Sequence, residues 1–196
     1  MYLIAGLGNP GAKYKHTRHN MGFLTIKALA GSLDVRLDNR RFKSRNARAT
    51  YQDKRILLVR PVTFMNQSGR SVKGCVDFYR IKPDHVLVIH DDIDLPLGRI
   101  KIVRNGGAGG HKGVLSVVHC LGSREFTRVK MGVGRPRHGE PIEDYVLSPI
   151  YGDEKEILLG VIAEAVQACK LFISEGIESA MNHVNAINLA EKEVTI

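Results

Sequence analysis

Short apolar runs alternate with amphipathic stretches along this chain. The runs are rich in Ile, Leu and Val, and polar or glycine-bearing segments bound them, as is typical of buried strands in a mostly parallel sheet. We expect strands at residues 2–5, 55–59, 85–89, 100–103 and 129–133. Between these runs, apolar residues recur at three- and four-residue steps. This spacing predicts helices at residues 21–33, 69–79 and 112–121.

The clearest helical pattern lies near the C-terminal end, over residues 153–174. Acidic residues stand at its start, where they suit the positive end of a helix dipole, and Gly176 follows its end. A shorter helix is expected at 177–187. Because strands and helices alternate, the sequence predicts an α/β fold. We expect one domain over 1–196, a three-layer α/β/α sandwich around a mixed, mostly parallel twisted sheet.

The composition fits one domain of this kind and adds a bias in charge. The chain has 196 residues, 43% of them hydrophobic, which is enough for a single substantial core. Its 29 Lys and Arg exceed its 20 Asp and Glu, and the excess is concentrated in residues 36–55 and, more mildly, 124–138. Such stretches attract a polyanion, although a merely solvated basic face is the alternative.

The sequence carries no expected export or membrane signal. The apolar run at residues 2–7 is too short for a signal peptide, and nowhere do eighteen apolar residues follow one another. The three cysteines are odd in number and widely spaced, which matches neither a disulfide framework nor a metal or redox pair. We therefore expect a cytoplasmic protein without a membrane span.

Candidate chemistry lies after the predicted strands, because open α/β sheets bind ligands beyond the carboxyl ends of their strands. His19 is a candidate general base, since an imidazole titrates close to neutral pH. Asp91 follows a predicted buried strand and could hold this histidine in one tautomer. Water is the better nucleophile, because the chain lacks a G-x-S-x-G motif. The alternative is that His19 is a surface or helix-start histidine.

Two asparagines follow other predicted strand ends. The amides of Asn9 and Asn66 could donate to a developing oxyanion or to a peptide carbonyl. Taken singly, each asparagine could equally serve as a turn or cap residue.

Two glycine-rich stretches admit ligand-binding interpretations. Residues 6–11 match G-x-G-x-x-G, the pattern of dinucleotide-binding folds, but helical periodicity begins only at Met21 rather than at the glycines. Residues 106–113 precede a predicted helix, whose N-terminus could receive a phosphate or carboxylate, or they form a flexible turn.

A metal site is a further alternative at residues 90–94, where His90 and three aspartates could bind zinc, magnesium or manganese. Side chains that alternate along a strand would instead point to opposite faces of the sheet, which argues against a shared metal.

The order and spacing of several short motifs resemble one known family over nearly the whole chain. The motifs are Gly6 to Gly11 with Tyr14, Arg18-His19-Asn20 with Gly22, residues 60–69, residues 90–96 with Gly98, residues 107–113 and residues 132–136. Together they closely resemble the bacterial-type peptidyl-tRNA hydrolases.

The resemblance implies that the chain hydrolyses the ester bond of peptidyl-tRNA, an N-blocked aminoacyl-tRNA, and so recycles tRNA without a metal or organic cofactor. It implies that His19 is the base for water, that Asp91 stabilises its basic form and that Asn9 distinguishes blocked from unblocked aminoacyl-tRNA. It also matches three residues to positions that contact the tRNA–peptide junction: Tyr14, Phe64 and Asn66.

Departures from the family pattern lie among the basic residues. Lys112 stands where asparagine is frequent, and an amine can donate a hydrogen bond but cannot accept one. Lys130 stands where arginine is frequent. For phosphate binding near the site we expect Lys101, Lys112 and Arg135. We expect a monomer without an obligate protein partner. The rival interpretation is a catalytically weak RNA-binding relative of the same fold.

Overall fold

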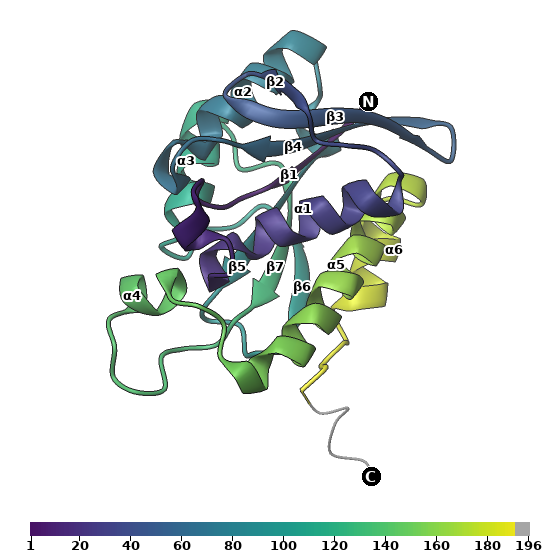
Figure 1. Cartoon of the computed structure of the whole chain (residues 1–196). Coiled ribbons are helices and arrows are strands. Elements are labelled where there is room, and N and C mark those ends of the chain that lie inside the picture. The colour runs from purple at the N-terminus through teal and green to yellow at the C-terminus, as the bar shows by residue number, and fades with distance from the viewer. Residues whose placement is uncertain (191–196) are drawn as a thin grey trace.

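The computed structural model describes residues 1–190, which form a seven-stranded mixed sheet with helices on both faces (Figure 1). The strand order is β2-β3-β4-β1-β5-β7-β6. The four central strands β4, β1, β5 and β7 are parallel, and both edges of the sheet are antiparallel. The strands are β1 (Tyr2–Gly6), β2 (Asn39–Arg41), β3 (Ser44–Tyr51), β4 (Lys54–Pro61), β5 (Val86–Asp92), β6 (Ile100–Arg104) and β7 (Thr127–Gly132).

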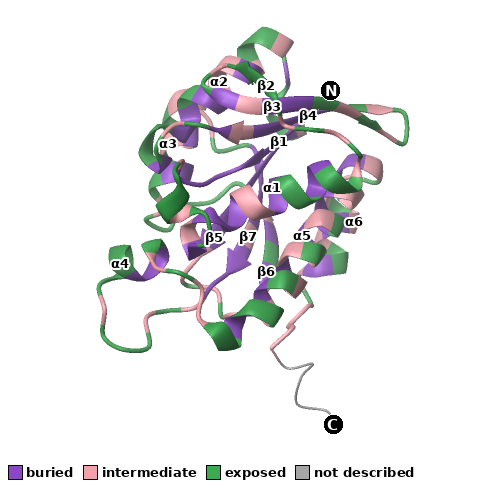
Figure 2. Cartoon of the chain, in the orientation of Figure 1, coloured by how far each residue is buried: buried purple, intermediate pink, exposed green. Residues whose placement is uncertain are grey.

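The helices form one layer on each face of this sheet. One layer contains α1 (Met21–Ser32), α5 (Lys155–Ser174) and α6 (Ile177–Val184), and the other contains α2 (Ser68–Tyr79) and α3 (Lys112–Leu121). Alternate residues of the central strands supply the two cores, so that Ile4 faces the first layer and Leu3 the second. The central strands are accordingly buried on both sides (Figure 2). The predicted α/β class and three-layer sandwich are confirmed.

All the predicted strands and helices are present, with ends that differ by a few residues. The helix predicted at 153–174 begins with a 3-10 turn, Gly152–Glu154, and continues as α5. The helix predicted at 177–187 ends earlier, at Val184. The predicted boundary of 1–196 includes residues 191–196, which lie outside the described part of the chain.

The β2–β3 hairpin, which was not predicted, forms an edge of the sheet from the basic stretch at 36–55. Polar residues hide its pattern, because Ser44 and Asn46 occupy buried positions and bond to each other. Arg40 and Arg41 of β2 are exposed. Charged side chains on an edge strand hinder pairing with other chains, so part of this basic stretch has a structural explanation.

Helix α4 (Ile142–Leu147) is the α-helix of the described residues that was not predicted. It is short, and a long loop after β7 carries it away from the sheet (Figure 1). Its buried residues are Tyr145 and Val146, which are too few to give a helical period in the sequence.

The first glycine motif allows close packing between β1 and α1. A Cβ atom on Gly6 would lie 2.1 Å from the carbonyl oxygen of Gly22, and one on Gly22 would lie 2.4 Å from the amide nitrogen of Leu7. The glycines therefore bring the start of α1 against the strand ends. This contact explains the motif without a dinucleotide.

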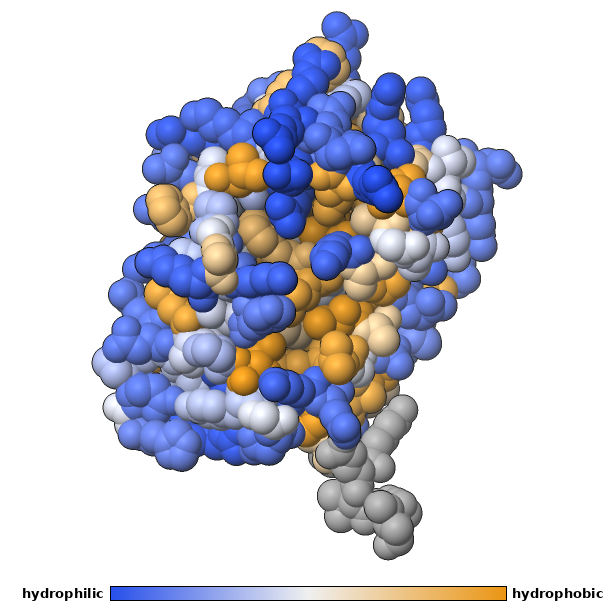
Figure 3. Space-filling model, viewed as in Figure 1, coloured by the Kyte–Doolittle hydropathy of each residue, from blue (hydrophilic) through white to orange (hydrophobic). Residues whose placement is uncertain are grey.

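Helix α5 with its preceding turn, Gly152–Ser174, is the one helix in residues 1–190 that is long and apolar enough to cross a membrane. Its apolar side packs into the core, where Val161, Ala165 and Cys169 are fully buried. Leu159 is exposed, and Figure 3 shows apolar side chains among charged ones on this face. Burial of this kind is typical of the core helix of a sheet-based domain.

Candidate active site

A cavity of about 650 Å³ opens beyond the carboxyl ends of β1, β4 and β5. This is where the topology of an open α/β sheet places a ligand site. Most of the site residues proposed from the sequence line it, namely Asn9, His19, Phe64, Asn66, Asp91, Lys112 and Arg135. Tyr14 and Lys101 are not among the lining residues.

His19 and Asp91 meet in this cavity as the sequence predicted. His19 lies on a 3-10 helix, Arg18–Asn20, between β1 and α1, and Asp91 lies near the end of β5. The Nδ1 atom of His19 is 3.0 Å from both carboxylate oxygens of Asp91. The side chains are 12% and 3% exposed, so the pair is largely shielded while the imidazole still reaches solvent.

His111 is a second partner of Asp91 that the sequence analysis did not assign. Its Nδ1 accepts hydrogen bonds from the backbone amides of Gly113 and Val114, at 3.1 and 3.2 Å. A nitrogen that accepts carries no proton, so the proton of neutral His111 is on Nε2, which lies 3.0 Å from Oδ1 of Asp91. His111 directly precedes a predicted helix within a glycine-rich stretch, and this position is the sequence feature that could have indicated a helix-capping side chain.

These bonds determine the protonation of the cluster. Burial raises the pKa of Asp91, but His19 and His111 outweigh burial and hold it well below its usual range. An ionised Asp91 accepts the Nδ1 proton of His19, which leaves the Nε2 lone pair free. Burial also lowers the pKa of His19, but Asp91 more than compensates, and the net pKa is raised above 6.5. Within residues 1–190 no hydrogen bond occupies this Nε2.

The Asn9 side chain is oriented by contacts between two strand ends. Its Oδ1 accepts from the backbone amide of Met65 at 2.8 Å. Its backbone is held in both directions by Asn20, whose Oδ1 accepts from the Asn9 amide at 2.7 Å and whose Nδ2 donates to the Asn9 carbonyl at 3.0 Å. The Nδ2 group of Asn9 is therefore the part of the amide available to donate in the cavity.

The rim of the cavity is exposed and charged. Phe64 and Asn66 are exposed after β4, on either side of the buried Met65. Lys112 donates to Glu143 of α4 at 2.6 Å, and Arg135 pairs with Asp94. These ion pairs are largely exposed, so they contribute little stability and their cations can exchange partners.

Tyr14 and Lys101 lie off the cavity. Tyr14 ends the 3-10 helix Ala12–Tyr14, where the Lys13 ammonium lies 4.7 Å from its ring centre. Lys101 is exposed on β6, directly across from Lys130 of β7, which itself pairs with Asp92 at 2.5 Å.

The predicted alternative metal site at residues 90–94 is not assembled. Asp92 bonds to Lys130 and to the backbone amide of Asp94, and His90 is buried with its Nδ1 on the carbonyl of Asp91. A different trio, His19, Asp91 and His111, has ligand atoms within 4.8 Å of one another. His111 fits a metal poorly, because its Nε2 would have to lose the proton while Nδ1 faces two backbone donors.

The second glycine stretch forms the turn before α3, where Gly106, Gly109 and Gly110 have positive φ. Two of the helix's first amides, those of Gly113 and Val114, already donate to the His111 imidazole. The stretch therefore positions His111 against Asp91. These two amides are not open for a phosphate, which was one of the possibilities raised by the sequence.

One cavity thus combines an imidazole with a free nitrogen, an ionised carboxylate that orients it and an amide donor from Asn9. A neutral imidazole can take a proton from water, and an amide donor can stabilise a developing oxyanion. The fold and the site together have the features of a hydrolase built on a three-layer α/β/α sandwich.

Comparisons with known proteins agree with this class. The family model described as peptidyl-tRNA hydrolase matches residues 3–193. Peptidyl-tRNA hydrolases from Caldicellulosiruptor saccharolyticus and Carboxydothermus hydrogenoformans are each 43% identical, over 94% of this chain and 96% and 98% of their own lengths. A crystal structure of peptidyl-tRNA hydrolase from Acinetobacter baumannii is 35% identical and superposes with a TM-score of 0.91 over 96% of each chain. The chain belongs to the peptidyl-tRNA hydrolase family.

Proposed function

We propose that this protein hydrolyses the ester bond of peptidyl-tRNA, with His19 as the general base and Asp91 as the residue that stabilises its basic form. The observation that supports these roles is the Asp91 cluster, in which both imidazoles bond to one carboxylate and Nε2 of His19 is left without a partner among the described residues. Membership of the family supplies the substrate, an ester between a peptide and the terminal ribose of a tRNA.

In the proposed reaction, Nε2 of His19 takes a proton from water as the water oxygen attacks the ester carbonyl. The amide of Asn9 donates to the resulting oxyanion. When the tetrahedral intermediate collapses, the bond to the ribose oxygen breaks and the imidazolium returns its proton to that oxygen. A positioned base contributes roughly 10² to 10⁴-fold, and an oxyanion donor about 10² to 10³-fold.

The rim residues are proposed to bind the tRNA end. Lys112 and Arg135 can exchange their carboxylate partners for phosphates, and Lys101 extends the basic surface onto β6. Tyr14, Phe64 and Asn66 are proposed to contact the tRNA–peptide junction. Because phosphate contacts release counterions, the affinity for tRNA should fall steeply with salt, with little preference among tRNA sequences.

The test is single-turnover hydrolysis of N-acetylated aminoacyl-tRNA by wild type and His19→Ala. We expect a loss of at least about a hundredfold in rate, with tRNA affinity near that of wild type. His119→Ala is the matched control, because His119 is exposed on α3 and outside the cavity lining. Equal turnover of the two variants would refute the role of His19. Wild type that binds tRNA without turnover would instead favour the RNA-binding interpretation.

We further propose that turnover needs neither metal nor organic cofactor, and that the protein acts in the cytoplasm as a monomer without an obligate protein partner. Activity should survive exhaustive chelation, since His111 is committed to its backbone amides. Light scattering under the conditions of the activity assay tests the oligomeric state, and we expect the mass of one chain. Loss of activity on chelation, restored by one metal, would contradict the first proposal.

A further inference from the structure

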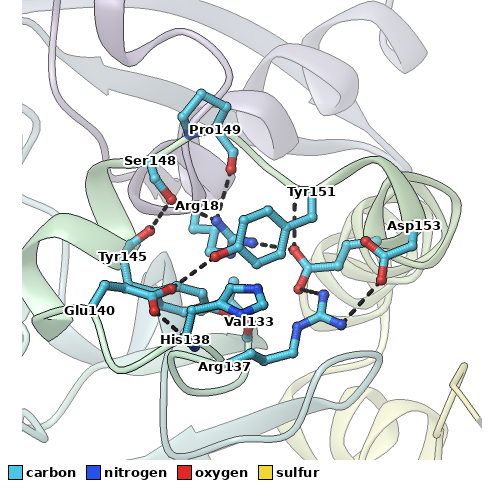
Figure 4. Close-up of polar contacts among 11 residues, drawn as sticks. Arg18, Val133, Arg137, His138, Glu140, Tyr145, Ser148, Pro149, Tyr151 and Asp153 are labelled. Atoms are coloured by element: carbon cyan, nitrogen blue, oxygen red, sulfur yellow. Dashed lines mark hydrogen bonds and ion pairs between the residues drawn. The ribbon is translucent and has the colours of Figure 1, made fainter.

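Arg18, the residue before His19, is completely enclosed by the segment that follows β7. Its side chain is 0% exposed. Its Nη1 donates to Ser148 Oγ and to the carbonyl of Pro149, both at 2.9 Å, and its Nη2 donates to Glu154 at 2.5 Å. The rings of Tyr145 and Tyr151 lie on the guanidinium, each with its centre 4.1 Å from Cζ (Figure 4).

The residues that enclose Arg18 are themselves tied together. The Tyr145 hydroxyl donates to the carbonyl of Val133 at 2.6 Å, and the Tyr151 hydroxyl donates to Glu140 at 2.8 Å. Arg137 donates to the second oxygen of Glu154 at 2.7 Å. The long loop, α4 and the 3-10 turn before α5 are therefore linked to one another around one guanidinium (Figure 4).

The same segment forms a wall of the cavity. Ile142, Val146 and Leu147 of α4 line it, while Tyr145 of the same helix contacts Arg18. One side of α4 thus faces the site, and another is held by the residue adjacent to His19. Arg18 connects this wall to the turn that carries the imidazole.

That turn is short, and its three residues are held by three different parts of the protein. Arg18 bonds to the α4–α5 segment, His19 to Asp91 and Asn20 to the backbone of Asn9. In addition, the backbone of residues 16–17 pairs with that of residues 149–150. A shift of Arg18 would be transmitted to His19, because adjacent residues of one 3-10 turn share their backbone geometry.

We propose that Arg18 is a positioning residue for hydrolysis, which holds the base on the 3-10 turn and the α4 wall of the cavity in one relative geometry. This rests on the proposed function. Arginine suits this set of contacts, because its two Nη groups donate to three acceptors while two aromatic rings lie against the guanidinium. Lysine keeps the charge but not this geometry. A buried ion pair is weak evidence for stability, so a role in fixing geometry accounts better for a charge buried here.

Arg18→Lys is the main test. We expect kcat to fall roughly 10- to 100-fold, since small misplacements of catalytic groups have effects of this size. The fall should persist at temperatures where urea titration shows the variant fully folded. The acid limb of the kcat profile should also move to lower pH, because a displaced His19 loses the support of Asp91. NMR titration of the ring nitrogens should report the same shift of the His19 pKa in the enzyme without substrate.

Arg137→Lys is the matched control, because Arg137 binds the same Glu154 from the exposed side and lies outside the cavity lining. We expect its kcat to stay within about twofold of wild type. A milder pair is Tyr151→Leu, which removes one of the two rings against the guanidinium and should lower kcat several-fold, and Tyr151→Phe, which keeps the ring and should not. This pair decides the question if Arg18→Lys does not fold.

A merely structural role predicts a different outcome. It is supported, and our proposal overturned, if folded Arg18→Lys has the kcat of Arg137→Lys and an unchanged His19 titration. Failure of the proposed function is separately visible, because wild type would then not hydrolyse the ester, whereas the NMR titration would still report whether Arg18 positions His19.

Discussion

Two buried carboxylates bind residues of the turn that carries His19, and they differ in the side chains they bind. Asp91 and Glu154 have side chains that are each 3% exposed, and each binds two nitrogen-bearing side chains. Asp91 binds the imidazoles of His19 and His111 beside the cavity. Glu154 binds the guanidiniums of Arg18 and Arg137.

Because of this difference, one cluster can take part in proton transfer and the other can only hold the structure in place. An imidazole changes its protonation near neutral pH, so the Asp91 cluster can accept and release a proton. A guanidinium stays protonated, so the Glu154 cluster can only fix positions. Arg18 and His19 are adjacent in sequence, and each belongs to one cluster. The fold therefore couples a titrating group directly to a permanent charge that holds its backbone.

The largest effect is expected when the Asp91 cluster is altered. Asp91→Asn should lower kcat by roughly 10² to 10⁴-fold, because an amide cannot enforce the His19 tautomer with the proton on Nδ1. The equivalent change in the triad of a serine protease lowers kcat for the same reason. Its free energy of unfolding should change far less than that of a Glu154 variant. Measurement of kcat and urea unfolding on the same sample tests this. A loss smaller than about tenfold would remove Asp91 from the mechanism.

Glu154→Ala should have the opposite balance between folding and chemistry. It leaves the guanidinium of Arg18 buried without its counterion, which costs about 3–5 kcal/mol of unfolding free energy. Glu164→Ala is the matched control, since its ion pair with His183 is partly exposed and should contribute under about 1 kcal/mol. Equal urea stability of the two variants would show that the Glu154 cluster is not a structural anchor.

The pH dependence should follow the Asp91 cluster. Because the pKa of His19 is raised above 6.5 by Asp91, kcat/KM should fall on the acid side with a midpoint above 6.5. The same raised pKa also makes folding stability depend on pH, but here the effect is lost at high pH. The stabilisation that protonated His19 gives is complete below its pKa in the unfolded chain and is lost as pH rises through its pKa in the folded protein. A kinetic midpoint below 6.5 would contradict this assignment.

The smallest expected effect concerns Lys112, whose positive charge lowers the pKa of His19. Lys112→Met should therefore move the acid limb of kcat/KM to higher pH. Because Lys112 is 61% exposed, added salt should reduce the difference from wild type. Glu143→Gln serves as a comparison, since it leaves the ammonium in place and removes its partner. An unmoved limb in low salt would show that Lys112 does not act on the imidazole.

Local patterns in the sequence determined most of the fold. Apolar runs gave the central strands and helical spacing gave the covering helices, because burial on two faces or on one side imposes these periods. The site followed in part, since parallel strands end at one edge and so bring residues 19 and 91 together. The β2–β3 hairpin was missed because Ser44 and Asn46 occupy inward positions, where an apolar residue would have shown a strand.

Only the tertiary structure decided the contacts between distant side chains. The role of His111 depends on backbone amides of α3, which fix its tautomer before it donates to Asp91. Arg18 meets Glu154, 136 positions further on, and no periodicity in the chain records that pair. Periodic patterns reflect the burial of each element by itself. Hydrogen bonds and ion pairs between elements depend on how the elements are placed, and that placement exists only in the folded chain.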